Sequence, residues 1–256
     1  MTGHLASIGR VWLRNAWVYR DRWYYGLLPN FFEPVFYLLG MGVGLGFYVS
    51  TGGAFDGDYL GFIIPGLIAA AAMNGASFET TYNVFVKLHF GKIYDATIAT
   101  PVGIEDVTLG EAAWAITRAV IYGGVFLLVT LAFGTAFDAR LLGALVAIAL
   151  VGFAFSALGL AFTSVVPTID LFSYYFTLFL TPSFLFSDIF FPVAERFPPI
   201  LATVAEFTPL YRSVQLMRGV MQNGGEGVLL DAGYLLAFGI AFLAFAVWRM
   251  RKRMIQ

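Results

Sequence analysis

The sequence has no cysteine and only two histidines, His4 and His89, so it excludes disulfide chemistry and leaves almost no material for a Cys/His metal site. It also lacks a glycine-rich phosphate loop of the Walker type, and we therefore expect no cofactor on the chain itself. Charged residues make up 12% of the 256 positions, about half the share that is usual in soluble domains. Of the whole chain, 59% is hydrophobic and the mean hydropathy is +0.79, which is the composition of a membrane protein.

Six apolar runs are each long enough to cross a bilayer, for which about 20 residues are needed. They cover residues 31–50, 60–82, 107–133, 141–166, 171–191 and 229–248. The sequence therefore predicts an all-α protein with six transmembrane helices and little chain left for a soluble domain. We divide it into an N-terminal interfacial helix, 1–28, and a six-span domain, 29–256.

Basic residues indicate the orientation of these runs. Ten of the fifteen lysines and arginines precede the first run, lie between the second and third, or follow the sixth. By the positive-inside rule, both termini are expected in the cytoplasm of a multi-pass plasma (inner) membrane protein. The N-terminus has no short apolar core followed by a small-residue cleavage site, so we expect it to remain on the mature protein.

Residues 5–23 are predicted to form an amphipathic helix in the interface plane. Its apolar side consists of Leu5, Ile8, Trp12, Ala16, Tyr19 and Trp23, and its polar side of Arg10, Arg14 and Asp21. One interpretation is an anchor that orients the first run. The other is a movable gate helix beside a translocation path, in which Trp12, Tyr19 and Trp23 would take part.

Charged groups inside the apolar runs are costly and need partners. Glu111 and Arg118 are seven residues apart and share one helix face, and Glu79 is placed to reach the same region. We predict a cluster of Glu79, Glu111 and Arg118 near the cytoplasmic side, either as a packing ion pair or as a functional group. No nucleophile with a base and an orienting acid can be assembled, so a catalytic site is disfavoured and no metal site is expected.

Glycine spacing and aromatic content mark two other runs. Gly40/Gly44 and Gly42/Gly46 have the GxxxG spacing that lets another helix approach, within one subunit or in a dimer. The run 171–191 is rich in aromatic residues, which suit the headgroup belt or a path for sugar rings and lipid tails. The segment 188–228 has too many prolines for one spanning helix, and we predict a pair of short re-entrant or interfacial helices there.

Three blocks in this order, "YDATIATPVGIEDVTLGEAAWAITRA", "DLFSYYFTLFLTPSFLFSDIFFPV" and "FTPLYRSVQLMRGV", resemble the permease subunits of type-2 ABC exporters. The similarity is greatest to nodulation-factor exporter permeases, and is more distant to daunorubicin-resistance and O-antigen exporter permeases. It runs from about residue 10 to residue 250. In relatives the position of Asp188 is often glycine.

The resemblance implies that the segment between the second and third runs is a coupling helix that inserts into a separate ATP-binding subunit. Its predicted contact residues are Phe90, Gly91, Lys92, Ile93, Tyr94, Asp95, Ala96 and Thr97. The resemblance further implies a permease homodimer with two ATP-binding subunits, which carry the ATP and Mg. The aromatic residues expected along the path are Tyr175, Phe179, Phe184 and Phe186.

We therefore expect an exporter permease that moves an amphiphile, namely a lipo-oligosaccharide, a glycolipid or a lipid-linked glycan, and that contacts membrane lipid and no nucleic acid. A hydrophobic-drug efflux permease of the same family is an alternative. A secondary transporter driven by ions would show matching inverted halves, and an intramembrane lipid enzyme would show clustered acids or histidines at one depth. The sequence has neither feature.

Overall fold

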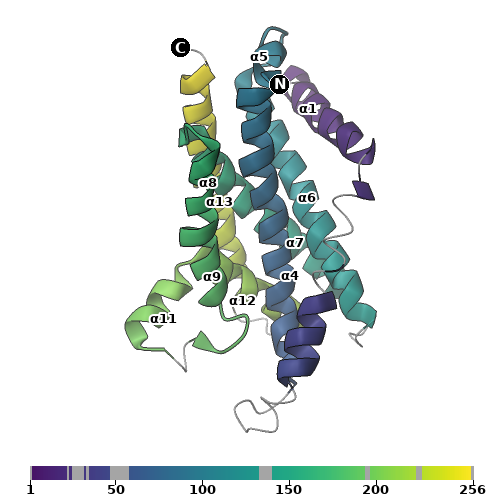
Figure 1. Ribbon diagram of the computed structural model, residues 1–256, viewed down its shortest axis with the longest axis vertical. Helices are drawn as coiled ribbons and strands as arrows, with labels where there is room; N and C mark the ends of the chain where they lie inside the picture. The colour runs from purple at the N-terminus through teal and green to yellow at the C-terminus, as the bar shows by residue number, and fades with distance from the viewer. Residues whose placement is uncertain are drawn as a thin grey trace.

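The computed structural model describes residues 2–21, 23–24, 32, 35–46, 58–132, 140–193, 197–222 and 227–254. Every regular element in these residues is a helix, as the sequence predicted. The long helices run side by side as a bundle, and both chain ends lie at the same end of it (Figure 1). We call this end the terminal end and the other the opposite end.

Four helices among the described residues are long and apolar enough to cross a membrane. They are the continuous helix Tyr59–Phe90, α6 (Ile104–Ala132), α7 (Arg140–Val165) and α13 (Val228–Met254). The first of them consists of α4 (Tyr59–Phe78) and two π-helical segments, η2 (Glu79–Asn83) and η3 (Val86–Phe90). It extends eight residues beyond the predicted end at 82.

The other two predicted spans are not long helices in the described chain. The run 31–50 falls partly outside the described residues and contains the π-helical segment η1 (Leu38–Leu45). The run 171–191 overlaps one unbroken helical stretch, 169–185, made of η4 (Ile169–Leu171), α8 (Phe172–Tyr174), η5 (Tyr175–Leu180) and α9 (Thr181–Leu185), and it is not among the four candidate spans. The count of six spans therefore stays a prediction.

Small residues let the helices of the bundle pack closely. A Cβ atom on Gly152 of α7 would lie 2.5 Å from the Cβ of Ala119 in α6. In the segment 38–46, Gly42 and Gly46 approach side chains of the first turn of α4, whereas Gly40 has open space around it. One of the two predicted glycine pairs is thus used for packing within the chain.

A proline inside α4 leaves a backbone carbonyl without its helical hydrogen bond, and a side chain from another helix region replaces that bond. Pro65 has no N–H, so the carbonyl of Gly61, four residues earlier, has no helical partner. The side-chain amide of Gln222 donates a 3.0 Å hydrogen bond to that carbonyl. Bulk water is absent from the hydrocarbon of a membrane and cannot bind this carbonyl. The hydrogen bond from Gln222 replaces the missing backbone bond, and the helix continues through the proline.

Two short helices, α11 (Pro199–Glu206) and α12 (Pro209–Met221), occupy the proline-rich segment at the opposite end. Leu210, Val214 and Met217 of α12 are buried against the bundle. The segment therefore forms two short helices, while their re-entrant character stays a prediction.

At the terminal end the six-residue helix α5 (Ile93–Ile98) connects η3 to α6, with one turn before it and one after it. Lys92, at the first turn, has φ +44°, a left-handed conformation that ends the preceding helix. The N-terminal helix α1 (Thr2–Asp21) lies obliquely against α6 at the same end (Figure 1).

Candidate functional site

Three polar side chains lie on one face of the long helix Tyr59–Phe90. Glu79, Asn83 and Lys87 are spaced four residues apart, and this spacing stacks side chains on a single helix face. Asn83 donates a 2.8 Å hydrogen bond to Glu79, and the Lys87 Nζ lies 3.3 Å from the same carboxylate. The π-helical turns η2 and η3 contain these residues, and such turns often occur at functional sites.

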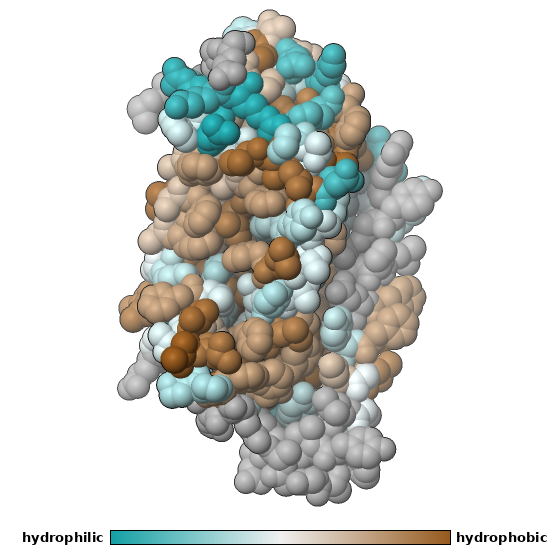
Figure 2. Space-filling model, turned by 60° about the vertical axis from the view of Figure 1, so that its left-hand side comes forward, coloured by the Kyte–Doolittle hydropathy of each residue, from teal (hydrophilic) through white to brown (hydrophobic). Residues whose placement is uncertain are grey.

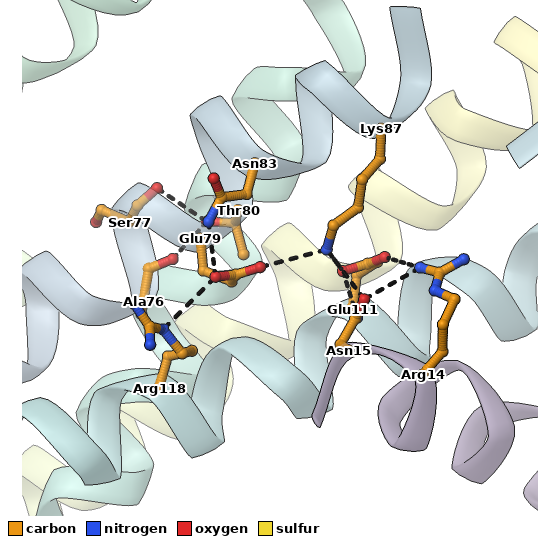
Figure 3. A network of polar contacts seen from close by, with 10 residues as sticks. All are labelled: Arg14, Asn15, Ala76, Ser77, Glu79, Thr80, Asn83, Lys87, Glu111 and Arg118. Carbon is orange, nitrogen blue, oxygen red and sulfur yellow. Dashed lines mark hydrogen bonds and ion pairs between the residues drawn. The ribbon is translucent and has the colours of Figure 1, made fainter. Parts of the chain in front are cut away.

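Lys87 joins this helix to α6. Its ammonium group lies 2.8 Å from the Glu111 carboxylate and 3.3 Å from that of Glu79, so one cation bridges two acids (Figure 3). The Glu111 side chain is only 1% exposed and the Glu79 side chain 6%. Carboxylates buried to this degree need charged or hydrogen-bonded partners.

The N-terminal helix α1 completes the site from the other side. Arg14 donates a 2.8 Å hydrogen bond to Glu111, and the Asn15 amide donates one of 2.9 Å to the second oxygen of the same carboxylate. Asn15 also accepts a hydrogen bond from Lys87 at 3.2 Å. We call Arg14, Asn15, Glu79, Asn83, Lys87, Glu111 and Arg118 the polar network (Figure 3).

The predicted orientation of Arg14 is therefore wrong. Arg14 is next to the buried residues Val11 and Asn15 in the helical projection, and its long side chain reaches inward from the edge of that face. Leu5, which was assigned to the apolar side, is 72% exposed.

Arg118 lies at the far side of the polar network. Its Nε atom is 3.6 Å from the Glu79 carboxylate, and its guanidinium group lies over the rings of Tyr19 and Tyr122 at 4.3 and 4.9 Å. It also donates a 2.8 Å hydrogen bond to the Tyr122 hydroxyl. The structure thus brings the three predicted residues, Glu79, Glu111 and Arg118, into one network.

Three residues that bind the Glu79 and Glu111 carboxylates, namely Lys87, Arg14 and Asn15, were not predicted from the sequence. Lys87 was counted as a basic residue of a cytoplasmic connection, and Arg14 and Asn15 were not assigned to the cluster. One signal was available for Lys87, because Glu79, Asn83 and Lys87 follow a four-residue period past the end of the apolar run. No comparable signal identifies Asn15, whose role depends on how α1 docks on α6.

Tyr94 fixes α5 to this site. Its side chain is fully buried, and its hydroxyl lies beside the Glu111 carboxylate without a hydrogen bond of normal geometry to any described residue. Burial raises the pKa of Tyr94 well above its ordinary value, and the nearby Glu111 carboxylate raises it further. A residue in this position holds the helix to the bundle. The coupling role of Tyr94 stays a prediction, and it would act through the position of α5.

The other predicted coupling residues are mostly on the surface. Phe90 is 69% exposed and Ile93 is 37% exposed, and Gly91, Lys92, Asp95 and Ala96 are also exposed. Thr97 is half-buried and donates a hydrogen bond to the carbonyl of Ile93. α5 therefore has one anchored residue, Tyr94, and one large exposed apolar side chain, Ile93, and the exposed Phe90 at the end of η3 lies just before it.

Two of the three predicted gate residues pack on α6. The rings of Trp12 and Tyr19 meet Trp114 edge to face at centroid distances of 6.1 and 5.7 Å. The Trp12 indole donates a 2.9 Å hydrogen bond to Thr117. Trp23 lies beyond α1, is 51% exposed and contacts the ring of Tyr24.

A cavity of about 370 Å³ lies between α4, α6 and the short helices η5 and α9. Its lining includes aromatic rings from Tyr37, Phe126, Phe176 and Phe184, and polar groups from Asn74 and Thr181, with no charged residue. Its volume is within the range of small-molecule sites, roughly 300–1,000 Å³.

Of the four predicted path residues, only Phe184 lines this cavity. Tyr175 is buried, packs against Phe162 and lies 3.3 Å from the Ser77 hydroxyl. Phe179 stacks on Tyr175, and Phe186 meets Phe197 near the opposite end.

A second charged cluster lies at the opposite end. Asp188 accepts hydrogen bonds from the Val193 backbone, from Gln215 at 3.0 Å and from Arg218. Its φ of +68° lies in the left-handed region, which glycine adopts most easily. The cluster ties the chain between α9 and α11 to α12, and Arg218 also lies over the ring of Phe62 in α4.

The four long apolar helices define a multi-pass membrane protein. The sequence profile of the "ABC-2 type transporter" family matches residues 7–222, and the chain belongs to this family. It is therefore a permease, a transport subunit rather than the ATP-hydrolysing one, and the family implies an ATP-binding partner.

Several relatives bear the name "Nodulation protein J". The protein from Sinorhizobium fredii is 35% identical over 96% of this chain and 93% of its own length. That from Rhizobium leguminosarum bv. trifolii is 37% identical over 82% and 79%, and that from Rhizobium leguminosarum bv. viciae is 34% identical over 96% and 94%. The predicted resemblance to exporter permeases is thereby confirmed.

Proposed function

We propose that the chain is the membrane-spanning subunit of an ATP-driven exporter that moves an amphiphile outward across the plasma membrane. In this proposal two copies pair with two ATP-binding subunits, and the terminal end with both chain termini faces the cytoplasm. The observation that carries it is the anchoring of α5. This short helix, with the exposed Ile93 and next to the exposed Phe90, is joined through Tyr94 to the polar network that connects α1, the helix Tyr59–Phe90 and α6.

This arrangement suits the transfer of motion from a soluble subunit to the spans. A partner that binds Phe90 and Ile93 and shifts α5 also displaces the Tyr94 ring beside Glu111. Because Glu111 is bound to both Lys87 and Arg14, the displacement reaches two other helices. Such a chain of packed and paired groups supports coupling when both ends favour the same alternative state.

The cavity supports an amphiphile as substrate. Its aromatic rings suit acyl chains and the apolar faces of sugars, while Asn74 and Thr181 supply hydrogen bonds without a fixed charge. We infer that the substrate is a lipo-oligosaccharide, a glycolipid or a lipid-linked glycan. The same lining fits an uncharged hydrophobic drug, which is the second candidate.

The coupling assignment is tested by replacing Phe90 and Ile93 together with aspartate. We expect the ATP-binding subunit to be lost on co-purification, because two apolar contacts would become charges. Thr100→Asp, which changes an exposed residue just after α5, serves as the control and should retain the subunit. Co-purification and transport at the wild-type level in the double variant would show that the contact lies elsewhere.

The substrate assignment is tested with the reconstituted complex and a panel of glycolipids and drugs. Phe184→Ala should lower substrate-stimulated ATP hydrolysis more than basal hydrolysis, because its ring lines the cavity. Phe179→Ala removes a ring of the same size that does not line it, and is the matched control. Equal effects of the two variants would contradict the assignment, and stimulation by drugs alone would favour the second candidate.

A further inference from the structure

Three cations share one face of the last turns of α13. Arg249, Lys252 and Arg253 are spaced i, i+3 and i+4, which places their side chains next to one another. None of them forms an ion pair with a carboxylate of a described residue. Like charges at this spacing repel, and an anion bound close by would relieve the repulsion.

These cations line a pocket of about 320 Å³ between α13 and the end of α7. Ser164, Val165 and Pro167 form its other wall. Arg253 is fixed in place, because it donates hydrogen bonds to the carbonyls of Thr163, Ser164 and Val166. Arg249 has no hydrogen bond to a described residue, and the Lys252 ammonium lies 4.1 Å from the centre of the Trp248 ring. Two of the three charges are therefore available to a ligand.

The surroundings of the pocket match the headgroup level of a bilayer. Trp248 is 50% exposed beside Lys252, and tryptophan is enriched at membrane–water interfaces. One turn earlier, Phe245 is 41% exposed on the same helix, which offers an apolar surface next to the charges. At the terminal end, a hydrophilic cap meets a broad hydrophobic surface (Figure 2).

We propose that this pocket binds the headgroup of an anionic phospholipid, with the phosphate between Arg249 and Lys252 and the acyl chains along the side of α13 that carries Phe245. An acidic surface of a protein partner would also satisfy the charges. The lipid is favoured because the cations adjoin an exposed tryptophan and an exposed phenylalanine, and this order of groups follows the order of headgroup and acyl chain in a leaflet. The proposal does not depend on the transported substrate.

The test is native mass spectrometry of the delipidated full chain with dioleoyl phosphatidylglycerol or dioleoyl phosphatidylcholine, which differ in headgroup charge and share their acyl chains. The variant is Arg249→Gln/Lys252→Gln. Each basic residue near a membrane surface strengthens the binding of anionic lipid by about fivefold. We therefore expect the variant to lose phosphatidylglycerol affinity by about fivefold per charge, and to bind phosphatidylcholine as the wild type does.

Arg251→Gln is the matched control, because it removes one charge from the same turns. Arg251 points away from the pocket and pairs with Glu105 at 3.1 Å. This variant should keep its preference for phosphatidylglycerol, and Arg249→Lys should keep it as well. Equal phosphatidylglycerol affinity in the wild type and the double variant would overturn the proposal. Loss of a co-purifying ATP-binding subunit from the double variant, with lipid affinity unchanged, would instead identify the pocket as a contact for that subunit.

Discussion

From the charge balance of the polar network we predict which of its members, when neutralised, lowers the stability of the fold most. Among the described residues the network has three cations, Arg14, Lys87 and Arg118, and two carboxylates, Glu79 and Glu111. Lys87→Met leaves two cations facing two carboxylates, and each acid keeps one arginine. Glu111→Gln leaves three cations facing one carboxylate. The loss of the acid should therefore destabilise the fold more than the loss of the lysine that it binds.

Magnitudes follow from the burial of the two groups. Glu111 is 1% exposed and pairs with two cations, and removing one partner from such a buried pair costs about 3–5 kcal/mol. Lys87 is 18% exposed, and its loss should cost about 1–3 kcal/mol, the value of hydrogen bonds to charged groups. For a chain of this size each kcal/mol lowers Tm by about 2–4 °C. We expect a decrease of roughly 10 °C for Glu111→Gln and roughly 5 °C for Lys87→Met.

The assay heats the detergent-purified variants and measures the monodisperse fraction by gel filtration. Glu105→Gln is the matched control, because Glu105 pairs with Arg251 at the surface and such pairs contribute about 0–1 kcal/mol. The reasoning would be refuted if Lys87→Met lowered Tm as much as Glu111→Gln or more. It would also fail if neither variant could be distinguished from the control.

Three other substitutions test individual contacts. Gly110→Ala should lower the free energy of unfolding by about 1–3 kcal/mol through overpacking, because the added Cβ would lie 2.6 Å from a side chain of α1. Altered fluorescence of Trp114 would report the loosening of α1. Gly9→Ala, whose added Cβ would meet open space, is the control. Tyr94→Phe should leave Tm unchanged or raise it, because it removes a buried hydroxyl without a partner, and a clear decrease would contradict this. Asp188→Asn removes the charge beside Arg218 and keeps a residue type that tolerates positive φ. It should therefore lower Tm by several degrees. An unchanged Tm would show that the Asp188–Arg218 pair contributes little to stability.

Hydropathy located the long helices well and misplaced the ends of two, Tyr59–Phe90 and α13. The predicted runs 107–133 and 141–166 match both ends of α6 and α7 within a few residues, and the run 229–248 matches the start of α13. A continuous apolar sequence leaves few alternatives to a helix in a bilayer. The helix Tyr59–Phe90 exceeds its predicted end, and its added turns carry Lys87 to the buried Glu111 carboxylate of α6. Composition along a window does not distinguish a polar residue that faces solvent from one that faces a buried partner.

The same limitation explains the partial prediction of the site. Glu79, Glu111 and Arg118 stood out because a charge within an apolar run has few possible surroundings. Lys87 lies beyond the end of its apolar run and Arg14 lies in an amphipathic helix, and at both places exposure and inward pairing are equally compatible with the sequence. Tyr94 was assigned to the surface from its place in a short cytoplasmic segment. Which side of a six-residue helix is buried depends on the turns on either side of it, and a six-residue sequence does not determine these.

The structure also bears on whether α1 is an anchor or a movable element. A helix that merely lay in the interface would interact with lipid and would need no polar contact with the spans. α1 instead contributes Arg14 and Asn15 to the Glu111 carboxylate, which also binds Lys87 and lies beside Tyr94 of α5. Because the carboxylate is shared, a movement of α5 that displaces Glu111 must either carry α1 along or break its two hydrogen bonds. Under the proposed coupling through α5, the geometry therefore favours α1 as an element that moves with it over α1 as a mere anchor.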